Sequence, residues 1–340
     1  MCDASCSETM TSPFRILSID GGGARGVVAA RLLVEIENVL RRRYGPTAHL
    51  ADYVDLVAGT STGAIVGGLL LLPDGAGGSK YDAQTVLKLY QERLPEIFTE
   101  TYRSRITSAF GWTGPLYSPS KLEALLRDYA GDHTLLGLRR PCLFTAHDVS
   151  HDKAHFFTNV PKVWHAETVE NFKLVDVMRA TTAAPTYFPS IHVKTPQNQY
   201  EFVDGGLFAN NPALCALTEA RCILKQPKIE QTVLISLSCG SLRRPLHNTE
   251  HWGKLQWAWP VIDIQMQTSA QVVDTQLEQI YHSVDRRRQY VRMDPTLTKN
   301  VDLDDVSTAT RTVLLRDAER WIDANRPQLE TVIDLLTRKL

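Results

Sequence analysis

Two strand–turn–helix units follow one another in the first 72 residues, and they constrain the fold more than any other feature of the sequence. An apolar run at 14–19 ends at three glycines and leads into an amphipathic helix that closes at Arg41–Arg43. A second apolar run, at 52–58, leads through Gly59 into an apolar helix that ends at Leu72. Strands that alternate with helices in this way are typical of a parallel α/β sheet.

The remainder of the chain continues as one α/β unit with a helical end. Helices are predicted at 81–94, 120–130 and 174–184, and strands at 142–146, 155–157, 200–203 and 232–237. A long helix is then predicted from the three- and four-residue spacing of Met266, Ala270, Val273, Leu277 and Ile280, and two further helices flank Pro327. We expect a flexible leader at 1–12 and a single domain at 13–340, with a core at about 14–240 and a helical C-terminal layer at about 250–340.

Composition excludes several classes of protein. The 340 residues carry 37 Lys and Arg against 38 Asp and Glu, a balance that argues against a DNA- or RNA-binding protein but is compatible with a weak membrane contact. The longest aliphatic stretch, Ala64–Leu72, is far shorter than the roughly 20 residues of a membrane-spanning helix. Met1–Ser12 does not resemble a secretory signal. Six cysteines without CxxC spacing predict reduced cytoplasmic thiols and no zinc site.

The first glycine cluster, Gly21-Gly-Gly-Ala-Arg-Gly26, follows a predicted strand and opens a helix. It satisfies the GxGxxG pattern of dinucleotide-binding folds, but the ribose-binding position about 20 residues on falls in Arg41–Tyr44, which has no carboxylate. A Walker loop fails because Val27 stands where lysine is required. Glycines at a helix N-terminus also direct N–H groups toward a negatively charged oxygen, as in an oxyanion hole. A tight turn that needs glycine for backbone room stays open as the simpler interpretation.

A nucleophile motif follows the second predicted strand. Gly59-Thr-Ser-Thr-Gly63 matches GxSxG between a strand and a helix, which is the context that motif requires. The glycines allow a sharp turn that exposes the Ser61 hydroxyl, although a simple helix N-cap is the alternative. A serine nucleophile needs a base. None of the histidines downstream has a setting that favours this role: His192, His247, His251 and His282.

A second acidic motif lies at Asp204-Gly-Gly-Leu-Phe-Ala-Asn-Asn-Pro212. An aspartate that ends a strand and precedes two glycines is expected at the functional edge of a parallel sheet. The glycines would hold the backbone in a turn that other residues adopt at a cost. Taken alone, the segment is better explained as an ordinary Asp-Gly turn.

Three motifs, taken together and in order, resemble the patatin-like phospholipase family: Asp20-Gly-Gly-Gly-Ala-Arg-Gly26, Gly59-Thr-Ser-Thr-Gly63 and Asp204-Gly-Gly206. Two connectors, at 180–189 and 208–212, also resemble that family, so the resemblance extends from about Phe14 to Ser238. It implies a three-layer α/β/α fold with a mainly parallel central sheet and extra C-terminal helices.

The resemblance also implies a chemistry. The protein would be a metal-independent serine lipid acyl hydrolase of the phospholipase A type, with a Ser–Asp dyad and no cofactor. Ser61 would be the nucleophile and Asp204 its base, and burial beside Ser61 is expected to raise the pKa of Asp204. The oxyanion hole would comprise Gly22, Gly23, Ala24, Arg25 and Gly26. A dyad explains why no histidine has a suitable setting.

Within the family, the size of the chain and its helical tail resemble the bacterial effectors of anti-phage (CBASS) signalling that cyclic oligonucleotides activate. That likeness implies a cytoplasmic enzyme that contacts the inner membrane peripherally when active. It also implies a cyclic di- or tri-nucleotide activator and a homo-oligomer on activation. Arg41–Arg43 and Arg286–Arg288 are candidates for the nucleotide site by charge, with solvated basic turns as the alternative.

Two groups of residues, most of them aromatic, are candidates for a lid or a membrane-contacting patch, and packing in a helical layer is the alternative for both. The first group is Phe110, Trp112, Leu116 and Tyr117, and the second is Trp252, Trp257 and Trp259. Two other functions stay open. One is a dinucleotide-binding oxidoreductase that rests on GxGxxG, and the other is a storage or binding protein that keeps the fold without the activity.

Overall fold

One sheet organises the protein. The computed structural model describes residues 12–98, 114–161, 169–223, 228–242 and 246–338, and the strands within these ranges form a single eight-stranded sheet. The strands are β1 (Phe14–Ile19), β2 (Leu56–Thr60), β3 (Cys142–Asp148), β4 (Lys153–Thr158), β5 (Ile191–Lys194), β6 (Gln199–Asp204), β7 (Thr232–Leu237) and β8 (Tyr290–Met293). Their order is β5-β6-β3-β2-β1-β7-β8, with β4 also paired to β3. Strands β3, β2, β1, β7 and β8 are parallel neighbours, and the other pairs are antiparallel.

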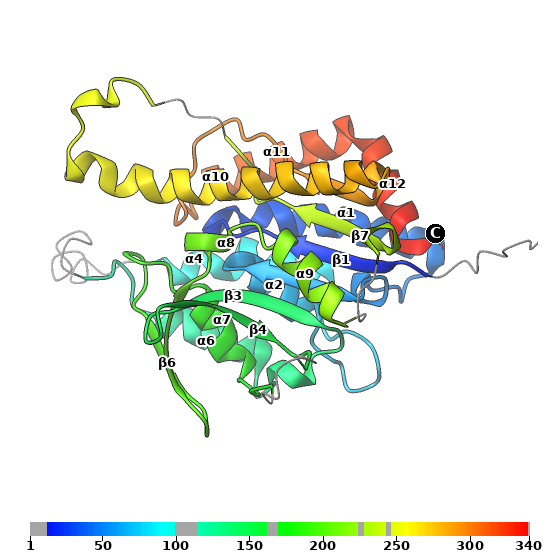
Figure 1. Ribbon diagram of the computed structural model, residues 1–340, viewed down its shortest axis with the longest axis horizontal. Coiled ribbons are helices and arrows are strands. Elements are labelled where there is room, and N and C mark those ends of the chain that lie inside the picture. Colours follow the sequence, from blue (N-terminus) through cyan, green and yellow to red (C-terminus); the bar gives the residue numbers. More distant parts are fainter. Residues whose placement is uncertain (1–11, 99–113, 162–168, 224–227, 243–245, 339–340) are drawn as a thin grey trace, which may run out of the picture.

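Helices cover both faces of this sheet (Figure 1). The described helices are α1 (Gly26–Tyr44), α2 (Thr62–Leu70), α3 (Ala83–Lys88), α4 (Leu94–Ile97), α6 (Ser120–Ala130), α7 (Leu174–Thr181), α8 (Gly206–Ala209), α9 (Ala213–Ile223), α10 (Lys254–Ser283), α11 (Thr308–Ala324) and α12 (Arg326–Thr337). Side chains of β1 alternate between two cores: Ile16 packs with α9 and α10, whereas Leu17 and Ile19 pack with α1, α2, α7, α11 and α12. The predicted α/β fold with a mainly parallel sheet is confirmed.

The C-terminal part departs from the prediction. The layer predicted to be helical at about 250–340 also contains β8, which extends the parallel sheet beside β7. Four residues that include an arginine give too little apolar pattern to mark a strand, so the pairing with β7 decides its structure. The short strand β5 was not predicted either. Strand β2 begins at Leu56 instead of 52, because 50–52 form a 3-10 turn.

The predicted helices of the C-terminal layer are present. The long one is α10, and the other two are α11 and α12, with Pro327 in the first turn of α12, where its missing N–H has no cost. No helix within the described ranges combines the length and the apolar composition that crossing a bilayer requires. Residues 1–11 of the predicted leader lie outside the described residues.

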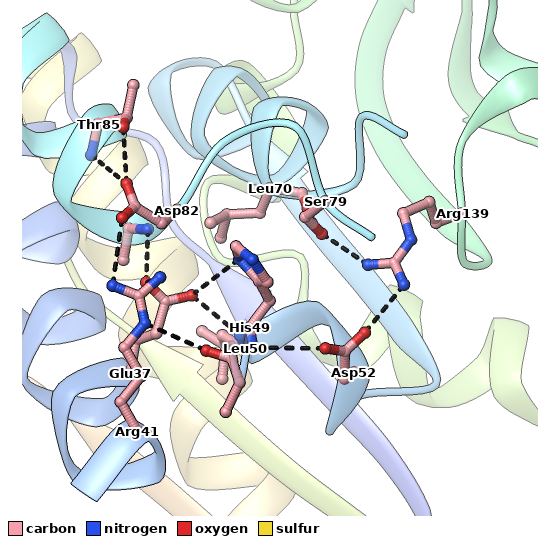
Figure 2. Close-up of polar contacts among 12 residues, drawn as sticks. Glu37, Arg41, His49, Leu50, Asp52, Leu70, Ser79, Asp82, Thr85 and Arg139 are labelled. Atoms are coloured by element: carbon pink, nitrogen blue, oxygen red, sulfur yellow. Dashed lines mark hydrogen bonds and ion pairs between the residues drawn. The ribbon is translucent and has the colours of Figure 1, made fainter. Parts of the chain in front are cut away.

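A buried carboxylate fixes the segments around the end of α1. Glu37 is only 2% exposed and accepts hydrogen bonds from the backbone N–H groups of Leu50 (3.0 Å) and Ala83 (2.9 Å). One turn along the helix, the Arg41 guanidinium lies 3.5 Å from Glu37 and 3.2 Å from Asp82, as Figure 2 shows. The network ties α1 to the turn before β2 and to the start of α3.

Glu37→Ala is expected to lower the free energy of unfolding by about 3–5 kcal/mol, because it leaves two buried N–H groups without their acceptor and removes one of the two carboxylates that pair with Arg41. Urea denaturation measures this change. Glu330→Ala is the matched control, since Glu330 is about half exposed and pairs with Arg43 at the surface. The control is expected to cost about 0–1 kcal/mol. Equal losses in the two variants would contradict a special role for the buried network.

Candidate active site

Ser61 occupies the sharp turn between β2 and α2. Its φ of +53° lies in the left-handed region, which residues other than glycine adopt rarely and mostly at functional sites. A Cβ at Gly63 would collide with the carbonyl oxygen of Ile19, so glycine is required for the turn to lie this close to β1. The Ser61 N–H donates to Thr181 Oγ1 at 2.8 Å, which fixes the turn from the end of α7.

Asp204 reaches Ser61 because two strands meet end to end. Strand β4 occupies one edge of β3, so β2 and β6 share the other edge, where β2 pairs with 142–145 and β6 with 146–148. The two strands run toward each other, and β6 therefore ends at Asp204 where β2 passes into Ser61. Asp204 does end a strand, but β6 is antiparallel to β3 and is not one of the parallel strands of the sheet. The antiparallel register is what brings the two motifs together.

The two side chains form a buried, hydrogen-bonded pair. Ser61 is 7% exposed and Asp204 is 5% exposed. The Ser61 hydroxyl lies within hydrogen-bonding reach of the Asp204 carboxylate, and the Gly206 N–H donates to Asp204 Oδ1 at 2.7 Å. Burial raises the pKa of Asp204 to about 6, although these two hydrogen bonds act in the opposite direction. The carboxylate is thus more basic than an exposed aspartate and still ionised at neutral pH.

The first glycine motif forms a turn whose backbone is held from two sides. Gly23 has a φ of +56°, a conformation that glycine adopts without strain. The Gly21 N–H donates to the carbonyl oxygen of Asn210 (3.0 Å), in the loop that follows the candidate base. The Ala24 N–H donates to the carbonyl oxygen of Leu303 (2.7 Å), in the loop before α11. These bonds link the glycine turn to the second acidic motif and to the C-terminal layer.

The hydrogen bonds of the turn leave two N–H groups for a ligand. Arg25 N–H donates to the Gly22 carbonyl (3.1 Å), and Gly26 N–H donates to the carbonyls of Gly23 and Ala24. Within the described part of the chain, the N–H groups of Gly22 and Gly23 have no acceptor. Of the five residues predicted to form the oxyanion hole, these two therefore present unengaged donors.

The Arg25 side chain does not enter the cavity that contains Ser61. Its Nε lies 3.4 Å from the Gly22 carbonyl, and the side chain lines a separate polar cavity that it shares with Asp20. The geometry therefore favours a role of the Arg25 side chain in bracing the turn over a charge placed beside the oxyanion.

An apolar pocket opens at Ser61 and Asp204. Its wall comes from α2, α4, α6, α8 and α10 and from the loop after α7. Large apolar side chains dominate it, among them Ile65, Phe98, Leu122, Phe188, Ile262 and Met266. Gly23 also lines the pocket, so the glycine turn faces the same space as the hydroxyl. A long hydrocarbon chain is the kind of ligand that such a wall favours.

The described lining of this pocket includes no histidine. The four downstream histidines considered above are all exposed: His192, His247, His251 and His282. Within the described ranges, no three His, Cys, Asp or Glu side chains are arranged to hold a metal ion. The group that contacts the Ser61 hydroxyl is the Asp204 carboxylate.

The first aromatic group does not form a surface patch where it is described. Tyr117 is buried, with its ring 5.1 Å from Phe98 and 5.8 Å from Phe188, and its hydroxyl donates to Asp304 at 2.6 Å. Leu116 packs against the same core. Tyr117 therefore supports the pocket wall from behind, as the packing alternative predicts. Phe110 and Trp112 lie outside the described residues.

The second aromatic group lies beside the pocket wall. Trp252 and Trp257 form an edge-to-face pair with centroids 5.2 Å apart at the start of α10. Further along this helix, Val261 is 52% exposed and Ile264 is 42% exposed, and the same helix lines the pocket. The side chain of Trp259 is outside the described part.

The two arginine clusters differ in their surroundings. Arg41–Arg43 are engaged in ion pairs: Arg42 lies 3.7 Å from Glu35, and Arg43 pairs with Asp334 at 3.3 Å and with a second carboxylate. Arg286–Arg288 are exposed, and two of them line a cavity beside β8 and α12. Only the second cluster offers cations to a ligand.

Sequence reasoning did not identify two residues that shape the site. Thr181, which accepts from Ser61 N–H, lies inside the connector at 180–189, so the resemblance contained a signal for it. Leu303 acts through its backbone carbonyl, and its polar surroundings carry no pattern that marks it.

Comparisons with known proteins agree with the geometry. A family model described as patatin-like phospholipase matches residues 17–217, which contain all three motifs. Patatin-like protein 2 of Oryza sativa subsp. indica is 29% identical over 96% of this chain and 89% of its own length. Patatin-like protein 2 of Arabidopsis thaliana is 30% identical over 86% of this chain and 78% of its own length. A Solanum tuberosum protein named probable inactive patatin-3-Kuras 1 is 28% identical over 94% of this chain and 89% of its own length. The chain therefore belongs to the patatin-like phospholipase family of carboxylic ester hydrolases.

Proposed function

We propose that this protein cleaves fatty-acyl esters of membrane phospholipids, with Ser61 as the nucleophile and Asp204 as its base. The observation that carries the proposal is that these two side chains are buried next to each other at the end of an apolar pocket. A serine hydroxyl with a basic partner, next to unengaged N–H donors, is the constellation for acyl transfer.

The first half of the reaction forms an acyl-enzyme. Asp204 accepts the hydroxyl proton as Ser61 Oγ attacks the ester carbonyl carbon. The negative charge that develops on the carbonyl oxygen is stabilised by the N–H groups of Gly22 and Gly23. When the tetrahedral intermediate collapses, the C–O bond to the alcohol breaks, and Asp204 returns its proton to the leaving lyso-lipid oxygen.

The second half releases the fatty acid. A water molecule gives its proton to Asp204 and attacks the acyl carbon, which regenerates a tetrahedral oxyanion in the same hole. Collapse breaks the bond to Ser61 Oγ, which recovers the proton from Asp204. No step of this cycle requires a metal or a cofactor.

The pocket and α10 together indicate what kind of substrate the protein binds and where it binds it. The apolar wall favours a fatty-acyl chain, and α10 contributes Ile262 and Met266 to that wall. The same helix presents Val261 and Ile264 outward, beside the Trp252–Trp257 pair. Exposed apolar side chains and half-buried tryptophans next to a lipid pocket are suited to the interfacial region of a bilayer. We infer a cytoplasmic protein that contacts the inner membrane peripherally during turnover.

The rate is expected to fall in acid. Asp204 acts as the base only when ionised, and its pKa is raised to about 6, so kcat/KM should be constant above pH 7 and decrease about tenfold per unit well below pH 6. A water-soluble short-chain p-nitrophenyl ester measures this profile without a lipid interface. A plateau that continues down to pH 4 would contradict Asp204 as the base.

Activation by a cyclic di- or tri-nucleotide stays a prediction from the resemblance. Arg287 and Arg288 are the candidates for binding the phosphates, because they are exposed and line a cavity. A panel of cyclic oligonucleotides is expected to raise fatty-acid release sharply, together with a larger mass in light scattering if a homo-oligomer forms. The Arg287→Ala/Arg288→Ala variant should lose the response and keep the basal rate. Panels without effect on rate or mass would contradict the prediction.

Fatty-acid release from phosphatidylethanolamine/phosphatidylglycerol vesicles tests the proposed function directly. The alternative is a storage or binding protein, and one relative is indeed named as probably inactive. Such a protein would release no fatty acid. Labelling with a fluorophosphonate separates the two further, since only an activated serine reacts. The dinucleotide alternative would require tight NAD or NADP binding, which a fluorescence titration measures.

A further inference from the structure

A buried ion pair lies directly before the glycine turn. Asp20 is 3% exposed, and its two carboxylate oxygens accept from the two terminal nitrogens of Arg292, on β8, with Nη1 at 2.9 Å from Oδ1. The Arg292 side chain is 11% exposed. A guanidinium that donates to both oxygens fixes the orientation of the carboxylate as well as its distance.

Arg292 is held in place independently of the glycine turn. Strand β8 pairs with β7 so that Arg292 lies opposite Ser236, and its Nη1 also donates to Ser236 Oγ at 2.7 Å. From the other side, Gln328 Nε2 of α12 donates to the Arg292 carbonyl at 3.0 Å. The cation therefore belongs to a rigid part of the sheet.

The glycine turn is thus anchored at both of its ends. At the first end, Asp20 bonds Arg292 through its side chain and the Leu237 carbonyl through its N–H (2.9 Å). At the second end, Ala24 N–H bonds the Leu303 carbonyl. Gly22 and Gly23, with their unengaged N–H groups, lie between the two anchors. These partner residues lie beyond residue 217, where the match to the family model ends.

We propose that Arg292 is a positioning residue for the oxyanion hole, which acts through Asp20 to hold the Gly22 and Gly23 N–H groups in the orientation that the transition state requires. The inference rests on the proposed function. Donors contribute most when they are fixed before the reaction, and a turn of three glycines has more backbone freedom than any other sequence. An interaction made mainly in the transition state affects kcat more than KM.

The test compares variants of the full chain with a short-chain p-nitrophenyl ester. Arg292→Gln is expected to lower kcat about 30- to 300-fold with KM within about threefold of the parent. Arg292→Lys keeps the charge but cannot form the bidentate contact with Asp20, and its kcat is expected to fall about tenfold. The control is Tyr290→Phe, which removes a partly buried hydrogen bond of the same strand, from the Tyr290 hydroxyl to Asp274 (2.6 Å), and no hydrogen bond of the turn. Its kcat should stay within about threefold.

The design separates this inference from the proposed function. If the parent and Ser61→Ala hydrolyse the ester equally, the proposed function fails. If the parent is active and Arg292→Gln retains kcat, or loses it no more than Tyr290→Phe does, the positioning role fails alone. Because removal of one partner of a buried pair can prevent folding, Asp20→Asn/Arg292→Gln removes both charges. The kcat of this double variant is expected to be no lower than that of the less active of the two single variants, Asp20→Asn and Arg292→Gln. A loss equal to the product of the two single losses would overturn the coupling through Asp20.

Discussion

Ser61→Ala is expected to lower kcat for fatty-acid release by at least about 10³-fold, because the variant cannot form an acyl-enzyme. The residual rate would come from the oxyanion donors and the pocket, which the substitution leaves in place. Release of fatty acid from phospholipid vesicles and hydrolysis of a p-nitrophenyl ester should fall by similar factors. The variant should also lose fluorophosphonate labelling, which the parent is expected to show.

Ser79→Ala is the matched control for this substitution. Ser79 is also a buried serine, and its hydroxyl donates to the Leu70 carbonyl at 2.9 Å and accepts from Arg139 Nη1 at 2.7 Å, away from the pocket. Its activity should remain within about twofold of the parent, since the two hydrogen bonds that it loses lie away from the pocket and each changes stability by about 1 kcal/mol. Retention of full activity by Ser61→Ala would disprove the nucleophile, whatever the control does.

Asp204→Asn is expected to lower kcat about 10²–10⁴-fold, which is the range that general-base catalysis contributes. The amide keeps the size of the side chain and can still accept from Gly206 N–H, so the geometry of the turn is preserved. What the variant loses is the ability to take the Ser61 proton. Its remaining activity should lack the decrease in acid that the parent shows near pH 6.

Thermal unfolding distinguishes this loss from misfolding. Burial raises the folded-state pKa of Asp204 from 3.8 to about 6, so the folded chain binds this proton more tightly than the unfolded chain. The stability that this proton provides is present below pH 3.8 and is lost as the pH rises toward 6. At pH 8 Asp204→Asn should therefore unfold at the same temperature as the parent or higher. Asp148→Asn, at another buried aspartate, should keep its activity because Asp148 bonds His151 outside the pocket.

The C-terminal layer contributes residues to the site. Residues 17–217 contain the proposed nucleophile, its proposed base and the glycine turn. The turn is held, however, by Arg292 of β8 and by the carbonyl of Leu303, and the pocket is closed on one side by Ile262 and Met266 of α10. A fragment that ended near residue 217 would carry every motif and lack these supports. The layer is thus required for the shape of the site.

The sequence by itself determined the local features of this protein. Periodicity predicted the first two strand–turn–helix units, and the glycines of GxSxG placed Ser61 on a sharp turn, since both depend on neighbouring residues alone. The resemblance of three motifs was sufficient to indicate the family and the Ser61–Asp204 pair. The short strand β8 and the engaged N–H groups of Ala24, Arg25 and Gly26 could not be predicted from these local patterns.

Tertiary structure decided how the local features combine. Asp204 meets Ser61 because β6 is antiparallel to β3 and shares one edge of β3 with β2, an arrangement that the sequence did not indicate. Gly22 and Gly23 became the available donors because Leu303, about 280 residues further on, takes the N–H of Ala24. Strand pairing and backbone acceptors are properties of segments distant in the chain. No local pattern encodes them, so they appear only once the sheet and its C-terminal layer are assembled.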